Sequence, residues 1–563
     1  MTALLTENMP LLAGAPNGIK KLRELILELA VRGKLVPQDP NDEPASELLK
    51  RIAEEKARLV AEGKIKKAKA TREELAEVSY EIPSSWAVAS LGQVVEIVRG
   101  ITFPASEKSK EPEPGRVACL RTANVQDEIE WDDLLYIRES FVSRHDQYVE
   151  PHDIVMSMAN SRELVGKVAL IGAELKQKTT FGGFLGVLRP MLIEPRFVMA
   201  LLRTPNARSA LIDSASQTTN IANVSLAKLR PLPFAIPPLA EQHRIVAKVD
   251  ELMALCDRLE AQQADADSAH AQLVQALLGG LTQARDAEDF AQSWQRLAEH
   301  FDTLFTTESS IDALKQTLLQ LAVMGKLVPQ DSGDEPASTL LKRIAEEKAR
   351  LVVEGKIKKQ KLLAQIGADE GSSKVSSGWE LVRFGQLIEL ISGQHLGPDE
   401  YFDSPQDGAI PYLTGPAEFG EVHPQPTRFT HERRATSIQG DILLTVKGSG
   451  VGKTNFVDQV ELAISRQLMA IRPVLLDTQF TRYLLLSMAE HFQSKSIGIA
   501  IPGISREDVL DAPIGLPPLP EQHRIVAKVD QLMTLCDQLK ARLGQARQVH
   551  EQLANALVEQ AVA

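Results

Sequence analysis

The chain has 563 residues, of which 44% are hydrophobic and 25% are charged, so it can form three to five packed units. Its formal net charge of −12 excludes a generic DNA-coating protein, because such proteins bind phosphates with an excess of Lys and Arg. The sequence has no secretory signal pattern and no run near the ~18 apolar residues of a membrane span, so we expect a cytoplasmic protein.

A block near the N-terminus occurs twice in the chain. Residues from Leu29 run LAVRGKLVPQDPNDEPASELLKRIAEEKARLVAEGKIKK, and residues from Leu321 run LAVMGKLVPQDSGDEPASTLLKRIAEEKARLVVEGKIKK. In both copies DEPAS precedes an apolar stripe at helical spacing, which predicts an amphipathic helix capped by Asp42 or Asp334. The duplication predicts an internal pseudo-two-fold repeat.

Two divergent segments, residues 80–236 and 373–516, follow these blocks. Short β-branched runs such as VVEIV and DILLTV are broken by Gly, Pro and Asn, which predicts mixed α/β domains. The two segments share a faint skeleton, since Trp86 matches Trp379 and LGQVVEIVRG from Leu91 matches FGQLIELISG from Phe384. Near-identical frames thus enclose unlike inserts, which is the arrangement expected of a scaffold with two different recognition domains.

A second duplicated block follows each insert, beginning at Pro237 and at Pro517. The copies run PPLAEQHRIVAKVDELMALCDRL and PPLPEQHRIVAKVDQLMTLCDQL. Both continue with a heptad seam, which predicts two helices of about 40 residues, or ~60 Å, that form an intramolecular coiled coil. We expect the first helix to end at Gly279-Gly280 and the second to reach the C-terminus. The seam positions are Ile245, Val249, Leu252, Cys256, Leu259, Gln263, Ala266, His270, Leu273 and Leu277, and Ile525, Val529, Leu532, Cys536, Leu539, Leu543, Ala546, His550, Leu553 and Leu557.

Two motifs that suggest catalysis do not withstand inspection, and a third is missing. The run KGSGVGKTN from Lys447 resembles a P-loop but has lysine where the motif requires its first glycine. Asp153 with Glu174 and Lys176 resembles a metal-dependent nuclease triad, yet nothing similar accompanies Asp441 in the other half. The NPP-aromatic motif of adenine methyltransferases is missing. The sequence therefore predicts a chain without catalytic residues.

The cysteines and histidines also fit structural roles. Cys119, Cys256 and Cys536 are too few and too scattered for a disulfide framework or a CxxC zinc site. Cys256, Cys536, His270 and His550 occupy matching positions, but their place in the heptad seam favours core packing over a metal site. His243 and His523 begin the long helices, where capping or hydrogen bonding is favoured over proton transfer. We therefore expect no metal.

Polar and basic residues on predicted loops of the inserts are candidates for contacts with a nucleic acid. Such side chains match the donors and acceptors of base edges and the charge of phosphates. In the first insert they are Arg121, Thr122, Asn124, Asn160, Ser161, Arg162, Lys167, Gln217, Thr218 and Asn220. In the second insert they are Thr414, Arg433, Arg434, Lys447, Ser449, Lys453, Arg466 and Gln467. Lys167 and Lys453 fit phosphate contacts better than base contacts.

The duplicated PPLxEQHRIVAKVDxLMxLCDxL, the duplicated LAVxGKLVPQ and the divergent inserts together resemble the DNA specificity subunits of type I restriction-modification systems. The resemblance covers essentially the whole chain. It implies an α+β fold in which long antiparallel coiled-coil helices separate two mixed α/β target-recognition domains. We accordingly expect an N-terminal helical segment (1–79), a first target-recognition domain (80–236), a central helical region (237–372), a second target-recognition domain (373–516) and a C-terminal helix (517–563).

The same resemblance implies that each insert recognises one half of a split, asymmetric site on double-stranded DNA. The helices would set the spacer and dock two methyltransferase (modification) subunits, and restriction or translocase subunits would join them. S-adenosylmethionine, ATP and Mg²⁺ would then bind to partner subunits and no cofactor to this chain. Two alternatives stay open: a DNA-modifying enzyme (nuclease or methyltransferase) linked to a coiled coil, and a purely structural assembly protein.

Overall fold

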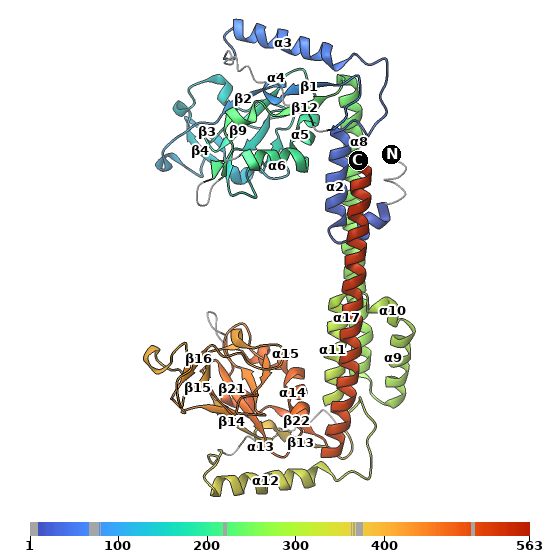
Figure 1. The fold of residues 1–563 in the computed structure, drawn as a ribbon, viewed down its shortest axis with the longest axis vertical. Helices are drawn as coiled ribbons and strands as arrows, with labels where there is room; N and C mark the ends of the chain where they lie inside the picture. The colour runs from blue at the N-terminus through green and yellow to red at the C-terminus, as the bar shows by residue number, and fades with distance from the viewer. Residues whose placement is uncertain are drawn as a thin grey trace. The chain divides into compact units, whose positions relative to one another are not determined.

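The computed structural model describes residues 9–66, 78, 80–214, 216–217, 222–361, 363, 366–367, 375–496 and 502–562. It divides into two compact units. Unit 1 comprises residues 1–266 and 546–563, and unit 2 comprises residues 267–545. Each unit combines a sheet-rich domain with helices from distant parts of the chain (Figure 1). This mixture of helices and sheets confirms the predicted fold class.

The sheet-rich domain of unit 1 is built from antiparallel strands with one parallel pair. Its four-stranded sheet has the order β2-β9-β5-β7, and a three-stranded sheet has the order β4-β3-β8, in which β3 and β8 are parallel. The strands are β2 (Val95–Arg99), β3 (Arg116–Leu120), β4 (Leu135–Arg138), β5 (Ile154–Ser157), β7 (Val168–Leu170), β8 (Thr179–Phe181) and β9 (Leu185–Pro190). Smaller sheets pair β1 (Ala87–Ser90) with β12 (Pro233–Ile236), and β6 (Ala159–Asn160) and β10 (Ser216–Gln217) with β11 (Ala222–Asn223).

Unit 2 repeats this plan. Its sheets have the orders β14-β21-β18-β19, β16-β15-β20-β17 and β13-β22, and β15 and β20 form the parallel pair. The strands are β13 (Glu380–Arg383), β14 (Ile388–Ser392), β15 (Ile410–Leu413), β16 (Arg428–Thr430), β17 (Thr436–Ile438), β18 (Ile442–Thr445), β19 (Thr454–Phe456), β20 (Glu461–Ile464), β21 (Leu468–Pro473) and β22 (Pro513–Leu516).

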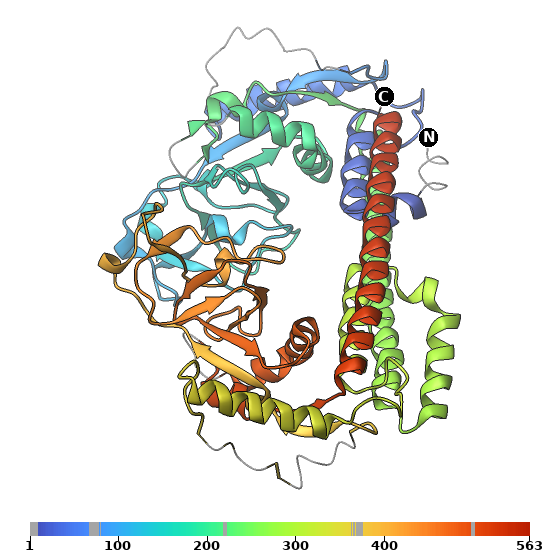
Figure 2. The same cartoon turned by 60° about the horizontal axis from the view of Figure 1, so that its bottom comes forward.

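Helices flank each sheet-rich domain at equivalent places. In unit 2, α12 lies along the domain in both views (Figures 1 and 2), and Lys348 of α12 donates to the carbonyls of Gly385 and Ile388 at 2.7 and 2.9 Å. The helices of unit 1 are α2 (Gly18–Val31), α3 (Ala45–Ala61), α4 (Leu91–Val94), α5 (Pro195–Arg203), α6 (Pro205–Ser214) and α7 (Leu226–Leu229). Those of unit 2 are α9 (Ala287–Glu299), α10 (Phe301–Leu304), α11 (Glu308–Val323), α12 (Ala337–Val353), α13 (Phe384–Leu387), α14 (Thr478–Ser487), α15 (Ala489–Lys495) and α16 (Arg506–Leu510).

Two long helices, α8 (Leu239–Gln283) and α17 (Leu519–Val562), contribute to both units. In unit 1 the first part of α8 shares a hydrophobic core with Ala554 and Ala561 of α17. In unit 2 Val274 and Leu278 of α8 share a core with Cys536 of α17. The beginning of each helix thus packs with the end of the other, which is the antiparallel order that the sequence predicts.

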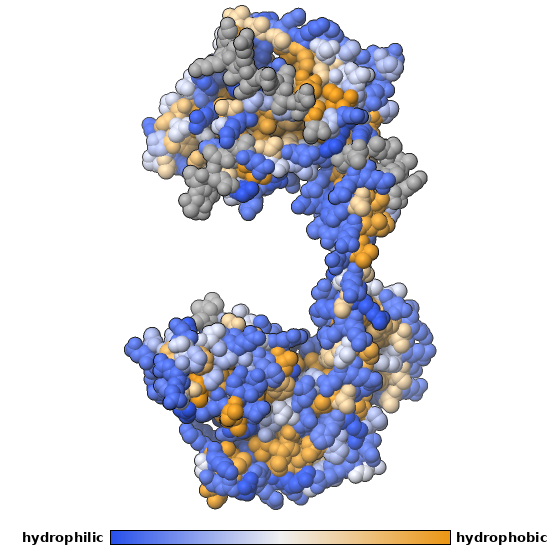
Figure 3. All heavy atoms as spheres, viewed as in Figure 1, coloured by the Kyte–Doolittle hydropathy of each residue, from blue (hydrophilic) through white to orange (hydrophobic). Residues whose placement is uncertain are grey.

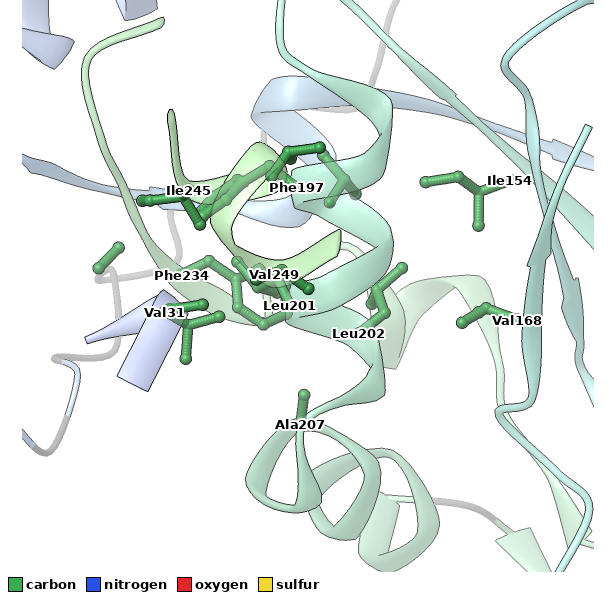
Figure 4. Packing of buried hydrophobic residues seen from close by; sticks show 14 of the residues in the cluster. Val31, Ile154, Val168, Phe197, Leu201, Leu202, Ala207, Phe234, Ile245 and Val249 are labelled. Carbon is green, nitrogen blue, oxygen red and sulfur yellow. The ribbon is translucent and has the colours of Figure 1, made fainter. Parts of the chain in front are cut away.

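The first turns of the long helices pack on the sheet-rich domains. Ile245 and Val249 of α8 lie against Phe197 and Leu201 of α5 (Figure 4), and all four side chains belong to one buried cluster. In unit 2, Ile525 and Val529 are buried with Phe480 and Tyr483 of α14. These seam positions are buried, as are Leu252, Cys256 and Cys536, while Leu259, Leu532 and Leu539 are half-buried. The described cluster around Ile525 and Val529 consists of residues from other parts of unit 2 and includes none from α8.

Three predictions about the helices are wrong in detail. The helix α8 continues past Gly279-Gly280 to Gln283, because Leu278 and Leu281 on either side are buried in the unit 2 core. Asp42 and Asp334 do not cap the short helices. Instead they pair with Arg244 and Arg524 at the beginnings of α8 and α17, each at 2.6 Å. The seam also shifts, since Leu273 and Leu553 are 52% and 47% exposed while Val274 and Ala554 are buried.

Candidate nucleic-acid interface

A hollow of about 770 Å³ opens on the sheet-rich domain of unit 1. It lies where β2 and β3 end and where the chain turns from β8 into β9. Three cations line it, Arg99, Lys108 and Arg121, and no Asp or Glu is among its described lining residues. Arg99 and Lys108 are exposed. On a chain of net charge −12, this concentration of positive charge suits a polyanion.

Two of the residues predicted from the first insert line this hollow, Arg121 and Thr122. The Arg121 side chain is 36% exposed and forms an ion pair with Asp133, so that carboxylate offsets part of its charge. Asn160 and Ser161 are half-buried at β6 and in the following turn, where the Asn160 side chain accepts from the Ser161 amide at 2.9 Å. Arg162 in the same turn is exposed.

The remaining predictions from the first insert have different outcomes. Asn124 is 1% exposed, and its amide donates to the carbonyls of Glu130 and Asp133 at 3.0 and 3.1 Å. It holds a loop together and cannot reach a base, so the prediction for Asn124 is wrong. Lys167 is half-buried and donates to Gln126 at 2.9 Å. Gln217 lies in β10 with its side chain outside the description, and Thr218 and Asn220 lie outside the described residues.

In the second insert, the structure exposes five predicted side chains on two loops. Lys447, Ser449 and Lys453 are exposed on the connection between β18 and β19. Arg466 and Gln467 are exposed on the connection between β20 and β21. Positive charge and amide or hydroxyl groups thus occur together, the combination that phosphate and base contacts require. Most of the visible face of both units is hydrophilic, with scattered hydrophobic residues (Figure 3).

Three other predicted residues of the second insert are engaged within the domain. Arg433 pairs with Glu461 at 3.1 Å, and Arg434 pairs with Glu400 and Glu432. Thr414 donates its hydroxyl to Glu418 at 2.7 Å, and the same carboxylate accepts from the Thr414 amide at 2.7 Å. These carboxylates offset part of the charge of both arginines, which are themselves exposed, and one of them occupies the threonine hydroxyl.

Three further residues line the hollow of unit 1 that were not predicted from the sequence: Arg99, Lys108 and Phe184. Phe184 is 65% exposed, more than any other aromatic side chain among the exposed large hydrophobic residues. Its signal in the sequence is the run FGGFLG from Phe181, in which two glycines separate two phenylalanines between predicted strands. The alternation alone does not reveal which phenylalanine faces solvent, because Phe181 is fully buried.

The duplicated EQHR motif fixes the beginning of each long helix to its own unit. Glu241 and Glu521 accept from the indole N–H groups of Trp86 and Trp379 at 3.0 and 2.9 Å. The glutamines one residue later accept from backbone amides that precede α5 and α14. His243 and His523 lie near Glu194 and Asp477 at 3.2 and 3.7 Å, which fits the predicted hydrogen-bonding role. The frame contacts are therefore the same in both copies.

The loops that resembled catalytic motifs have other geometries. The glycine-rich loop after Lys447 connects two antiparallel strands, whereas a P-loop leads from a strand into a helix. Asp153 is 1% exposed and binds Arg189 through both carboxylate oxygens at 2.8 Å. Within the described ranges, no three His, Cys, Asp or Glu side chains are grouped so that they could hold a metal ion. No helix in those ranges has the length and apolarity of a membrane span.

Fold and site together define a protein in which a duplicated helical frame carries two unlike recognition domains. The sequence family described as "Type I restriction modification DNA specificity domain" matches residues 83–266 and 376–546. The chain is 38% identical to the specificity subunits of the type I restriction enzymes EcoEI and EcoAI of Escherichia coli, over 97% of this chain and 94% of each relative. It therefore belongs to the family of type I restriction-modification specificity subunits. A solved chain of a type I R-M system shares the fold, with a TM-score of 0.51 and 21% identity over 86% of this chain and 99% of that one.

Proposed function

We propose that the chain is the DNA-specificity subunit of a type I restriction-modification complex. Each sheet-rich domain recognises one half of a split, asymmetric site on double-stranded DNA. The two long helices set the unread spacer and dock two modification subunits, and restriction or translocase subunits complete the complex. S-adenosylmethionine, ATP and Mg²⁺ bind to those partners, and this chain contributes recognition without catalysis.

The observation that carries this proposal is the contrast between frame and loops. The Trp–Glu, Arg–Asp and Lys–carbonyl contacts recur in both units at equivalent positions. The exposed side chains of the candidate interface differ, since Arg99, Lys108 and Phe184 occur in one domain and Lys447, Arg466 and Gln467 in the other. A DNA-binding protein with two identical domains would select a palindrome, whereas two unlike domains on a repeated frame select two different half-sites.

The test is an exchange of one domain. Residues 80–236 are replaced by the corresponding segment of a specificity subunit with another target, and the chain is expressed with its modification partner. Long-read sequencing then maps methylated adenines. We expect one half of the recognised site to change while the other half stays the same. A change in both halves, or in neither, would refute the assignment of one half-site to each domain.

Two further measurements separate the alternatives. The purified chain, supplied with Mg²⁺, ATP and S-adenosylmethionine, is expected neither to methylate nor to cut DNA, and either activity would support an enzyme. A structural assembly protein would bind random and target duplexes equally in the presence of the modification subunit. The specificity subunit is expected to prefer the target strongly at the same salt concentration, because phosphate contacts alone do not discriminate sequence.

A further inference from the structure

Two β-turns occupy equivalent places in the two sheet-rich domains. In unit 1 the turn Gly182–Leu185 is closed by the Leu185 amide, which donates to the Gly182 carbonyl at 2.8 Å. In unit 2 the turn Ser465–Leu468 is closed by the Leu468 amide, which donates to the Ser465 carbonyl at 2.9 Å. The first turn joins β8 to β9 and the second joins β20 to β21. Both therefore lead from the parallel strand pair into the four-stranded sheet.

The backbone of both turns is held firmly by neighbouring strands. The Phe184 carbonyl accepts from the amides of Met158 and Ala159 at 2.8 and 3.2 Å, and the Gln467 carbonyl accepts from the Val446 amide at 2.9 Å. Each turn also passes against a glycine. A Cβ at Gly100 would lie 2.1 Å from the Gly182 carbonyl oxygen, and a Cβ at Gly393 would lie 2.0 Å from that of Ser465. Such fixed backbones can present a side chain in one position.

The central residues of the turns differ while the backbones match. Gly183-Phe184 occupies the centre of the first turn and Arg466-Gln467 the centre of the second. Phe184 is 65% exposed, and both Arg466 and Gln467 are exposed. Exposed side chains do not contribute to the core, so folding does not explain why phenylalanine stands in one turn and glutamine in the other. A difference in what the turns contact explains it.

The surroundings indicate that the contact is DNA. Phe184 lines the hollow whose charged residues are Arg99, Lys108 and Arg121, and Gln467 is adjacent to the exposed Arg466. Cations beside a turn can hold phosphates and so bring base edges within reach of the turn. In the major groove, a phenylalanine can contact the methyl group of thymine, and a glutamine amide can pair with N6 and N7 of adenine. The two turns thus carry complementary chemistries for different bases.

We propose that these turns select one base pair in each half-site. Phe184 contacts the thymine methyl group in the half-site of the first domain. Gln467 pairs with adenine in the half-site of the second domain, and the missing side chain at Gly415 leaves space for its amide, because a Cβ there would lie 2.4 Å from Gln467 Oε1. This assignment rests on the proposed function and adds the recognition element and the base to it.

The experiment uses the full chain in complex with its modification subunit. The variants are Phe184→Ala and Gln467→Ala, with Leu192→Ala and Val460→Ala as matched controls, because those apolar side chains are 52% and 83% exposed and do not line the hollow. All four positions are exposed, so each variant should fold. Methylome mapping is expected to show Phe184→Ala relaxing one thymine position of one half-site and Gln467→Ala relaxing one adenine position of the other.

Modified duplexes then identify the contacted group. Uracil in place of that thymine removes only the methyl group, and its loss should weaken binding by about fourfold, the effect of one buried methylene. On the uracil duplex Phe184→Ala should cause no further loss, because the two changes remove one contact. Similarly, 7-deazaadenine should weaken binding of the wild type by about 5-fold or more and leave Gln467→Ala unaffected.

The outcomes separate this inference from the proposed function. If the wild-type complex recognised no split site, the proposed function would fail. If the wild type recognised one but Phe184→Ala and Gln467→Ala kept its motif unchanged, only the turn assignment would be overturned. A uniform loss of binding to all sequences would also overturn it, because that result describes a wedge or a backbone contact and not base selection.

Discussion

At the residue scale, the charged side chains of the two domains are of two kinds. Some form buried ion pairs that stabilise the fold, and others are exposed to solvent. Asp441 is 1% exposed and binds Arg472 through both oxygens at 2.8 Å, as Asp153 binds Arg189 in unit 1. Burial acts to lower the pKa of Arg472, yet Asp441 and Glu389 together raise it. Arg99, Lys447 and Arg466 of the candidate interface are instead exposed. Substitutions at the two kinds of site should therefore affect different properties.

We expect Asp441→Asn to destabilise the second domain by about 3 kcal/mol, because it leaves the half-buried Arg472 without its main counter-charge. The amide oxygen can still accept from the Ile438 backbone N–H, but the NH2 group then faces an N–H of Arg472, so the change removes the charge and one hydrogen bond of the pair. Hydrogen exchange of the β18 and β21 amides reports the local free energy of opening. Glu461→Gln is the matched control in the same domain. Its pair with Arg433 is exposed, with side chains 32% and 48% accessible, so about 0–1 kcal/mol is expected. Equal effects of the two variants would contradict this distinction.

At the element scale, the long helices show how far a repeat pattern can be extrapolated. The distance from Cys256 to Val274 is 18 residues, which equals five turns of a straight α-helix, and Cys536 and Ala554 are related in the same way. A heptad seam instead places the buried residues at Leu273 and Leu553, which are exposed. Because 3.6 residues per turn and a 3.5-residue repeat diverge along a long helix, the predicted seam holds near Cys256 and fails two to three heptads later.

The same reasoning explains what the sequence could predict about the domains. The duplicated frame, the two α/β inserts and the two long helices follow from local patterns, and the structure confirms them. The interface residues do not follow in this way, because exposure depends on tertiary partners. Asn124 and Arg121 are three residues apart on one loop, yet one is buried by hydrogen bonds across the loop and the other reaches the hollow. Similarly, Glu418 accepts a hydrogen bond from Thr414 and Glu461 pairs with Arg433, two residues that the sequence predicted as DNA contacts.

The anchor at the beginning of α17 gives a pH-dependent prediction. Burial raises the pKa of Glu521, and its Oε1 atom is buried with no hydrogen-bond partner among the described residues. Because the pKa of Glu521 is raised in the folded state, the folded chain binds more protons than the unfolded chain at pH values just above 4.5, which is the ordinary pKa of a glutamate. The stability that this group contributes is therefore present below pH 4.5 and is lost as the pH rises through the folded-state value.

Glu521→Gln should remove this dependence while it keeps an acceptor for the Trp379 indole. We expect the thermal midpoint of unit 2 to rise relative to the wild type at pH 7 and to change less at pH 5. Glu241→Gln is the control, because Glu241 accepts a second hydrogen bond from Gln38 at 3.0 Å and its charge is better stabilised. Its effect should be smaller. A greater gain for Glu521→Gln at pH 5 than at pH 7 would show the sign to be wrong.

At the scale of the whole molecule, each unit requires a part of both long helices. The first part of α8 and the last part of α17 contribute to the core of unit 1, and the opposite parts contribute to the core of unit 2. Between these parts, residues 261–269 of α8 and 544–549 of α17 are exposed. The cores thus fix the ends of the helices, while the exposed stretches can change in length without loss of a buried contact.

Insertion of seven residues into both exposed stretches should therefore preserve both cores and lengthen each helix by about 10 Å. Under the proposed function, we expect methylome mapping to show the same two half-sites with a longer unread spacer. The same insertion in α8 alone is the control. It should lower the thermal midpoint and abolish methylation, because helices of unequal length cannot fill both cores at once. If the paired insertion altered the half-sites, the helices would not act on spacer length alone. That result would contradict their proposed role of setting the spacer.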